Sequence, residues 1–148
     1  MLFSFVALGM IALAFLIFIG IRAARINENP PPLGGTNSER LQFLSEFGWE
    51  VKKEPISTVR VQIPMSFDEV YEKYNEIQRR QNFDLRKYAG KTVDRFCYVV
   101  TNYPNYPDDI RANLLICEKE IIGGDICSNI EPPFMHEFSY KQVNSANN

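Results

Sequence analysis

The sequence predicts an α+β domain, in which an antiparallel sheet of about five strands is packed by two helices and preceded by one transmembrane helix. Three observations predict this architecture. Leu2 to Ile21 is an uncharged run whose only polar residue is Ser4. Two later segments have apolar residues at helical spacing, and five short segments have the apolar pattern of strands. Without the anchor and a linker, roughly 110 residues remain, which is enough for one domain with a single core.

The apolar run at the N-terminus is long enough to cross a membrane. At about 1.5 Å per residue, a helix over Leu2–Ile21 spans about 30 Å, the thickness of the hydrocarbon core of a bilayer. A cleavable signal peptide usually has a shorter apolar region and a small-x-small cleavage site, whereas the small pair Ala23-Ala24 directly follows Arg22. A buried core helix is rarely so uniformly apolar. We therefore interpret residues 1–25 as an uncleaved single-pass anchor with a basic flank, which makes the lipid bilayer the first expected partner.

The residues alone leave open the side of the membrane on which the domain lies. Arg22 and Arg25 follow the apolar run and no basic side chain precedes it, so the positive-inside rule places the domain in the cytoplasm. An anchor that begins directly at a start codon is unusual. A basic leader upstream of Met1 is therefore expected, and it would reverse the orientation.

A linker and a short helix are predicted after the anchor. Residues 26–35 include three consecutive prolines and two glycines, a composition typical of a semi-rigid linker with a hinge. The α+β domain is expected over residues 36–138. Thr36 and Glu39 match a capping box, and the apolar spacing that follows predicts a helix that ends at Gly48.

Two strands and a second helix are predicted next. Alternation of apolar and polar residues predicts strands at Trp49–Val51 and at Val59–Ile63. Ser66 and Glu69 repeat the capping-box pattern. Apolar residues three or four positions apart then predict a helix from Phe67 to about Asn82.

Three further runs complete the predicted sheet, namely Lys91–Thr101, Ile110–Cys117 and Ile121–Cys127. The first two are apolar on both faces, as central strands are. Gly123-Gly124 inside the third run predicts a β-bulge or a close approach of the backbone. Residues 139–148 are polar and are predicted to be a disordered tail.

A series of short motifs runs through the domain in order. They include Gly48-Trp-Glu-Val51, Phe67-Asp-Glu-Val-Tyr71, Gln81-Asn-Phe-Asp-Leu85, Asn102-Tyr-Pro104, Arg111-Ala-Asn-Leu-Leu115 and Ile122-Gly-Gly-Asp-Ile-Cys-Ser128. Through them, the chain from Thr36 to Phe138 resembles a family of bacterial domains of unknown function found in Firmicutes, the one numbered 4830. The resemblance implies an N-terminal anchor with the domain outside the cytoplasm, and it supplies no activity. Members usually carry a basic segment before the apolar run, which this chain lacks.

Composition and motifs argue against several classes of site. The formal charge is −2, with Lys and Arg scattered among acids, so nucleic-acid binding is not expected. His136 is the only histidine and no Gly-x-Ser-x-Gly motif accompanies it, so no catalytic residue is predicted. The three cysteines and His136 lack the paired spacing of a zinc site, and Asp108-Asp109 lacks the ligand pattern of a calcium loop. No cofactor or metal is therefore expected.

The three cysteines leave two interpretations open. They are small buried apolar residues in strands, or Cys97 and Cys117 form a cross-strand disulfide. If the strands around these two residues form one hairpin, its midpoint is Pro107, within the predicted loop, and the two cysteines face each other. We expect this bond if the domain lies outside the cell.

The loop over residues 103–109, which we name the Tyr-Pro loop, is the most suggestive surface. Its candidate partner-binding residues are Tyr103, Pro104, Tyr106, Pro107, Asp108 and Asp109. Two tyrosines on a proline-stiffened loop offer rigid amphipathic area at a small entropy cost, which predicts a protein-binding surface. The alternative is that the prolines only shape the turn and the tyrosines lie on the domain.

The sequence therefore predicts a single-pass membrane protein whose small extracytoplasmic domain is a binding or structural module. A cell-envelope enzyme or enzyme inhibitor is one alternative, and a tethered regulatory domain facing the cytoplasm is another. An accessible cleft with converging acids would favour an enzyme. A shallow domain with an exposed aromatic loop would favour a binding module.

Overall fold

The computed structural model describes residues 30–106 and 108–139 of the chain. The predicted anchor over Leu2–Ile21 and nearly all of the predicted tail therefore lie outside the described residues. Among the residues that the structure describes, no helix has the length and apolar character needed to cross a bilayer. From Pro31 onward, the described residues form one compact unit.

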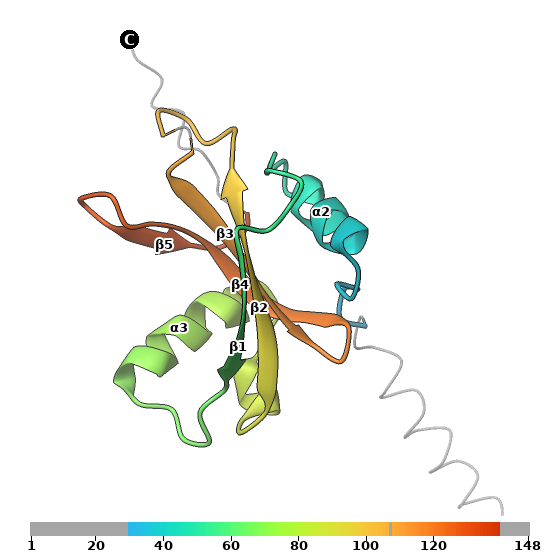
Figure 1. Ribbon diagram of the computed structural model, residues 1–148. Coiled ribbons are helices and arrows are strands. Elements are labelled where there is room, and N and C mark those ends of the chain that lie inside the picture. Colours follow the sequence, from blue (N-terminus) through green and yellow to red (C-terminus); the bar gives the residue numbers. More distant parts are fainter. Residues whose placement is uncertain (1–29, 107, 140–148) are drawn as a thin grey trace, which may run out of the picture. The chain divides into compact units, whose positions relative to one another are not determined.

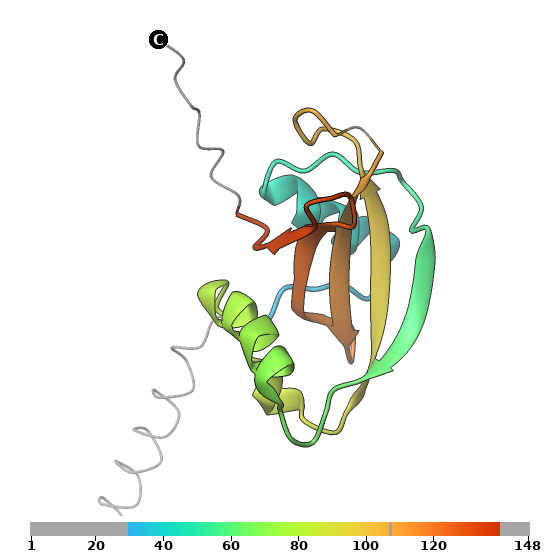
Figure 2. The ribbon, with the colours of Figure 1, turned by 90° about the vertical axis from the view of Figure 1, so that its left-hand side faces the viewer.

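Five strands form one antiparallel sheet, in which each strand pairs with its neighbours in the sequence. Figure 2 shows the strands side by side in this order, from β1 in green to β5 in red. The predicted α+β class and the five-stranded antiparallel sheet are confirmed. The strands are β1 (Ser57–Gln62), β2 (Thr92–Val100), β3 (Ile110–Cys117), β4 (Glu120–Ser128) and β5 (Phe134–His136).

The two predicted helices lie on opposite sides of this sheet (Figure 1). They are α2 (Asn37–Glu46) and α3 (Glu69–Arg80), and a short 3-10 helix, η1 (Leu85–Tyr88), follows α3. Successive side chains of a strand point to opposite faces, so β3 contributes to two apolar clusters. Leu114 packs in the cluster on the α2 side, and Leu115 packs in the cluster on the α3 side.

The first helix begins and ends as the sequence predicts. The Glu39 amide donates to the Thr36 hydroxyl over 3.2 Å, and the Thr36 amide donates to the Glu39 carboxylate over 2.8 Å. This reciprocal pair is the capping box, which satisfies two backbone donors at the helix start. Gly48 follows the helix with φ of +82°, a conformation that favours glycine.

The second helix starts later than predicted. Asp68 is the N-cap, because its carboxylate accepts the Tyr71 amide over 2.8 Å, and the helix begins at Glu69. The predicted cap at Ser66 and the predicted start at Phe67 are therefore wrong. Ser and Asp cap helices almost equally well, so the sequence offered two caps without ranking them. The Phe67 ring instead packs edge-on against Tyr71, with ring centroids 4.6 Å apart.

Five strands were predicted and five are observed, but one predicted strand is absent from the sheet and one observed strand was not predicted. The predicted strand at Trp49–Val51 is only an isolated bridge between Val51 and Val100. β5 was not predicted, because three residues are too few to show an alternating pattern. Predicted strand boundaries for β3 are confirmed at both ends.

The hairpin between β3 and β4 has an unusual turn and a β-bulge. Glu118 and Lys119 form its two-residue turn, with φ of 53° and 72°, although such turns favour Asn and Gly. Further along, Leu115 pairs with Gly123 while Ile116 pairs with Ile121, so one residue of β4 between them has no partner on β3. The predicted bulge is therefore confirmed, immediately before Gly123.

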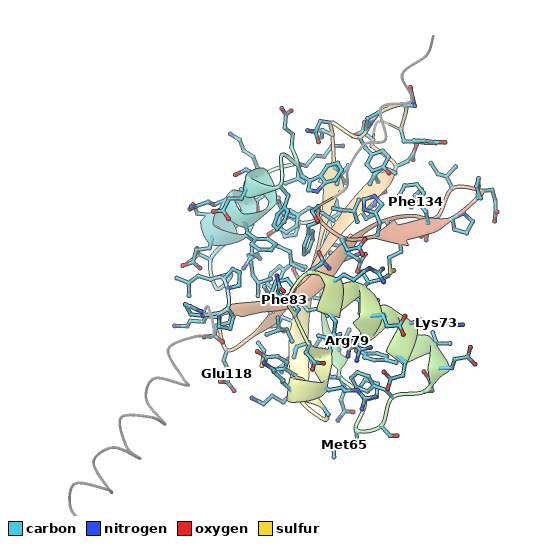
Figure 3. The ribbon with its side chains drawn as sticks, turned by 180° about the vertical axis from the view of Figure 1, so that it is seen from behind. Met65, Lys73, Arg79, Phe83, Glu118 and Phe134 are labelled. Atoms are coloured by element: carbon cyan, nitrogen blue, oxygen red, sulfur yellow. The ribbon has the colours of Figure 1, made fainter. Side chains whose placement is uncertain are left out.

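The two ends of the sheet differ in the loops that they carry. We name the end with loops 101–109 and 129–133 the apical end. The opposite end, with connections 63–68, 89–91 and 118–119, is the basal end. Figure 3 shows Phe134 and Met65 far apart, at the apical and basal ends respectively.

Candidate functional site

A stack of aromatic rings lies at the apical end of the sheet. The Tyr103 ring is nearly parallel to the Trp49 indole, at 5.6 Å between centroids and 5° between planes. The Phe134 ring stacks on Tyr103 at 5.5 Å and 25°. Trp49 is itself fixed, because its indole N–H donates to the Phe138 carbonyl over 2.8 Å. One tyrosine of the Tyr-Pro loop is therefore part of the packed domain, as the alternative interpretation predicted.

His136 completes this stack and is held as a neutral ring. Its Nδ1 lies 2.6 Å from the Glu137 carbonyl, which can only accept, so Nδ1 carries the proton. The Nε2 atom, 3.2 Å from the Tyr103 hydroxyl, then accepts from that hydroxyl. Burial lowers the pKa of His136, which favours the same neutral form. These contacts explain His136 as a packing residue that orients Tyr103.

The other described residues of the Tyr-Pro loop are exposed to solvent. Tyr106 is 40 % exposed, with its ring centroid 6.3 Å from that of Tyr103 in an edge-to-face arrangement. Pro104, Asp108 and Asp109 are exposed as well, while Pro107 lies outside the described residues. The structure therefore separates the two predicted tyrosines into a partly buried support, Tyr103, and an exposed ring, Tyr106.

Two neighbouring segments hold this loop in place. Lys52 forms an ion pair of 3.0 Å with the Asp108 carboxylate. The Arg111 guanidinium donates to the Asp108 carbonyl over 2.6 Å. The Asn102 side chain bonds both the Glu50 amide, over 3.0 Å, and the Gly48 carbonyl, over 2.8 Å. The loop is therefore joined to the chain on both sides of Trp49.

A polar cluster lies on the α3 side of the sheet, centred on Asp125. The Tyr74 hydroxyl donates to one carboxylate oxygen over 2.9 Å, and the Asn113 amide donates to the other over 2.9 Å. The same amide lies 3.3 Å from the Cys127 sulfur. Asp125 is only 2 % exposed, and burial raises its pKa.

This cluster is closed rather than reactive. Burial, and then the neighbouring Asp125, raises the pKa of the Cys127 thiol to about 12. Burial likewise raises the pKa of Tyr74 well above its usual value, with Asp125 as a second cause. A thiol must ionise to act as a nucleophile, and a general acid or base must reach its substrate. Asp125 has both oxygens engaged by protein donors, so the cluster fits a structural network better than a catalytic site.

The structure does not bring Cys97 and Cys117 together. Cys97 lies opposite Asn113 in the register of β2 and β3, and all three cysteines are free thiols. Cys117 is four residues further along β3, which is roughly 13 Å at about 3.3 Å per residue. A disulfide needs Cα atoms within about 7 Å. The predicted pairing assumed a hairpin centred on Pro107, whereas the register centres it on residue 105.

The described residues also bear on the other predicted sites. Among them, no group of three or more His, Cys, Asp or Glu side chains is placed to hold a metal ion. A shallow groove of about 280 Å³ lies beside α2, lined in part by Leu33 and Glu39. The Glu39 carboxylate is engaged in the capping box, and that hydrogen bond lowers its pKa. The second acid of the lining, Glu46, accepts a hydrogen bond from the Gln42 side chain over 3.4 Å.

Sequence reasoning identified the Tyr-Pro loop but missed the residues that support it. Trp49 and Phe134 lie far from Tyr103 in the sequence, and only the pairing of strands places them together. The sequence signal that was available is the Asn102-Tyr-Pro104 motif, because Asn102 connects the loop to the chain around Trp49.

Comparison with known proteins gives one match. Residues 43–126, more than half of the chain, match the model of a family described as Domain of unknown function (DUF4830). No curated protein and no solved structure matches the chain.

Proposed function

The chain belongs to the family described as Domain of unknown function (DUF4830), and we propose that it is a single-pass membrane protein whose domain binds a protein partner through the Tyr-Pro loop. The anchor would be the apolar run over Leu2–Ile21. The domain would lie on the extracytoplasmic side. The observation that carries the binding role is the exposed Tyr106 ring on a loop supported by packed aromatic side chains.

A supported loop suits binding because little entropy is lost when it meets a partner. Tyr103 is fixed between Trp49 and Phe134, and it positions the segment from which Tyr106 projects. The Tyr106 ring supplies apolar area and a hydroxyl with only two side-chain torsions to restrict. Tyrosines in such positions are enriched among the residues that dominate binding energy.

The same features favour a binding module over an enzyme. The buried carboxyl with a raised pKa, Asp125, is engaged by Tyr74 and Asn113 and does not open to solvent. The Asp108 carboxylate is paired with Lys52, and Asp109 is the second exposed acid of the Tyr-Pro loop. The charge of Asp109 favours a partner with basic side chains, since complementary charge steers association.

The extracytoplasmic side is proposed from the resemblance to the family. Arg22 and Arg25 favour the opposite side, and free cysteines are compatible with either compartment. Introducing Asp109→Cys gives an exposed thiol at the Tyr-Pro loop. We expect a membrane-impermeant maleimide to label this variant in intact cells above the background of the unsubstituted chain. Labelling only after permeabilisation would instead identify a tethered domain facing the cytoplasm.

The same variant tests the binding surface. A benzophenone maleimide attached at Asp109→Cys should give a discrete photo-crosslinked product in membranes. Adding Tyr106→Ala should reduce the yield at least about tenfold, the loss expected for a residue that dominates an interface. Arg60→Cys, an exposed position on β1, is the matched control and should give no such product. An equal yield with and without Tyr106→Ala would reject the Tyr-Pro loop as the binding surface.

A further inference from the structure

The basal end of the domain exposes the two most accessible large apolar side chains of the described residues. Met65, between β1 and α3, is 79 % exposed, and Val70, in the first turn of α3, is 76 % exposed. Neither belongs to the two apolar clusters of the domain. Figure 3 shows Met65 projecting from the bottom of the molecule, away from Phe134. Packing inside the domain therefore does not explain why these two positions are apolar.

The loop that carries Met65 is fixed to the neighbouring turn. The Gly90 amide donates to the Ile63 carbonyl over 2.8 Å, and the Ile63 amide donates to the Lys91 carbonyl over 2.9 Å. The Met65 sulfur lies directly over Gly90, where an added Cβ would be 2.2 Å from it. This arrangement places the Met65 thioether on the surface of the turn, where most of the side chain remains exposed.

The charges around these two side chains are largely matched. Lys73, three residues after Val70, pairs with Glu69 at 2.8 Å, and Lys91 pairs with Glu118 at 3.1 Å. Further ion pairing joins Arg86 to Glu72. Binding at the basal end would therefore depend on apolar contact rather than on net charge.

The chain enters the domain at this same end. The Gly34 amide donates to the Lys119 carbonyl over 2.8 Å, and Leu33 forms a bridge with Glu120 at the start of β4. From the end of the predicted anchor at Ile21 to Pro31, roughly ten residues reach at most about 35 Å. Such a tether keeps a bilayer at high effective concentration beside the basal end.

We propose that the basal end of the domain docks on the surface of the lipid bilayer through Met65 and Val70. This inference rests on the proposed membrane anchor. Apolar side chains at such a surface enter the boundary between headgroups and acyl chains, about 5–10 Å deep. Docking in this way turns the Tyr-Pro loop away from the membrane, toward a partner. The contact needs no anionic lipid, because it is apolar.

Quenching by brominated lipids tests this orientation in the full chain. Trp49 is the only tryptophan and packs at the apical end. The length of β2, Thr92–Val100, separates the two ends by about 26 Å, at about 3.3 Å per residue. The full chain is reconstituted in phosphatidylcholine vesicles with plain or brominated acyl chains. Trp49 is common to all variants, so the difference from the unsubstituted chain isolates an added tryptophan.

We expect the emission added by Met65→Trp to fall by about half or more in brominated vesicles, because the side chain reaches the acyl chains. Val70→Trp is a second reporter at the same end, with the same expected loss. Tyr106→Trp is the matched control at the apical end, and its added emission should be the same in both kinds of vesicle.

The outcomes separate this inference from the proposed function. Release of the chain from vesicles by alkaline carbonate would overturn the anchor, and the docking with it. Retention of the chain with no quenching of Met65→Trp or Val70→Trp would overturn the docking alone. Quenching of Tyr106→Trp in place of the basal reporters would also overturn it, because the domain would then face the bilayer with its apical end.

Discussion

The two faces of the sheet are covered by helices in different ways. On one face, α2 inserts Phe43 and Leu44 into a cluster of buried apolar side chains. On the other face, the fully buried residues of α3 are Asn75 and Gln78, both of which are polar. The α3 helix is therefore positioned on the sheet by hydrogen bonds to a larger extent than α2 is.

These hydrogen bonds connect α3 to the backbone of β4. The Gly124 amide donates to the Gln78 side chain over 2.8 Å, and the Gly124 carbonyl accepts from Gln81 over 3.1 Å. Gln81 also accepts the Phe138 amide over 2.8 Å. Gly123 makes this approach possible, since a Cβ at this position would lie 2.7 Å from the Gln78 oxygen.

The two helices contribute to the fold in different ways. Apolar burial scales with area and supplies most of the free energy of folding. A hydrogen bond contributes about 0.5–1.5 kcal/mol net, but it is directional and costly to leave unmade. Apolar clusters on both faces supply stability, and the hydrogen bonds of Gln78 and Gln81 in addition define the position of α3 against β4.

The largest effect is expected from Leu44→Ala on the α2 side. Leu44 has no exposed surface, so its truncation leaves a cavity and should lower the free energy of unfolding by about 2–5 kcal/mol. Urea unfolding followed by Trp49 fluorescence measures this loss. Gln42→Ala, on the exposed side of the same helix, should change stability by less than about 0.5 kcal/mol. Similar losses for both variants would contradict the assigned packing of α2.

A smaller loss is expected from Gly123→Ala on the α3 side. The added Cβ would lie 2.7 Å from the Gln78 side-chain oxygen and 3.3 Å from the Leu85 side chain, so the strand or these side chains must move. We expect a destabilisation of about 1–3 kcal/mol by the same unfolding measurement. Hydrogen exchange should show faster exchange of α3 amides than of α2 amides. Unchanged exchange in α3 would show that the helix does not depend on this close approach.

The smallest effect, and the one specific to the α3 side, is a pH dependence from Asp125. Burial raises its pKa in the folded state above the ordinary value of 3.8, so the folded state binds this proton more tightly than the unfolded state. The contribution of Asp125 to stability therefore decreases as pH rises from about 4 through the folded-state pKa.

The Asp125→Asn variant removes this proton while keeping a side chain of the same shape. We expect the stability of the variant relative to the unsubstituted chain to increase as pH rises over that window. Urea unfolding of both proteins between about pH 4 and pH 8 measures the difference, and other carboxyls cancel because both proteins contain them. A difference that is constant with pH would contradict a raised pKa at Asp125.

The sequence predicts helix α3 but not how it packs. Its apolar residues at helical spacing identify the helix, and Tyr71 and Tyr74 lie on the buried side as predicted. A sequence pattern predicts that polar residues of a helix face solvent, so Asn75 and Gln78 would be predicted to be exposed. They are inside because they have specific hydrogen-bond partners. Asn75 donates to Asp84 and accepts from the Leu85 amide, and Gln78 accepts from the Gly124 amide.

The candidate binding site shows the same division. Local chemistry marks the Tyr-Pro loop, because prolines and tyrosines are unusual together in a short connection. Which tyrosine is exposed depends on Trp49 and Phe134, which come from other parts of the chain. The cysteine pairing failed for a related reason, since a shift of the hairpin centre by two residues places Cys97 opposite Asn113. Strand register depends on the loop geometry, which the sequence pattern does not contain.

The sequence by itself determined the class of the domain, the presence of β1 to β4 and the start of α2, because these depend on periodicity and on local capping. The tertiary structure decided the start of α3, the register that separates Cys97 from Cys117, and the division of the Tyr-Pro loop into support and exposed ring. The physical reason is the range of the interactions. Capping and periodicity act within one turn, whereas register and ring stacking join residues that only the fold brings together.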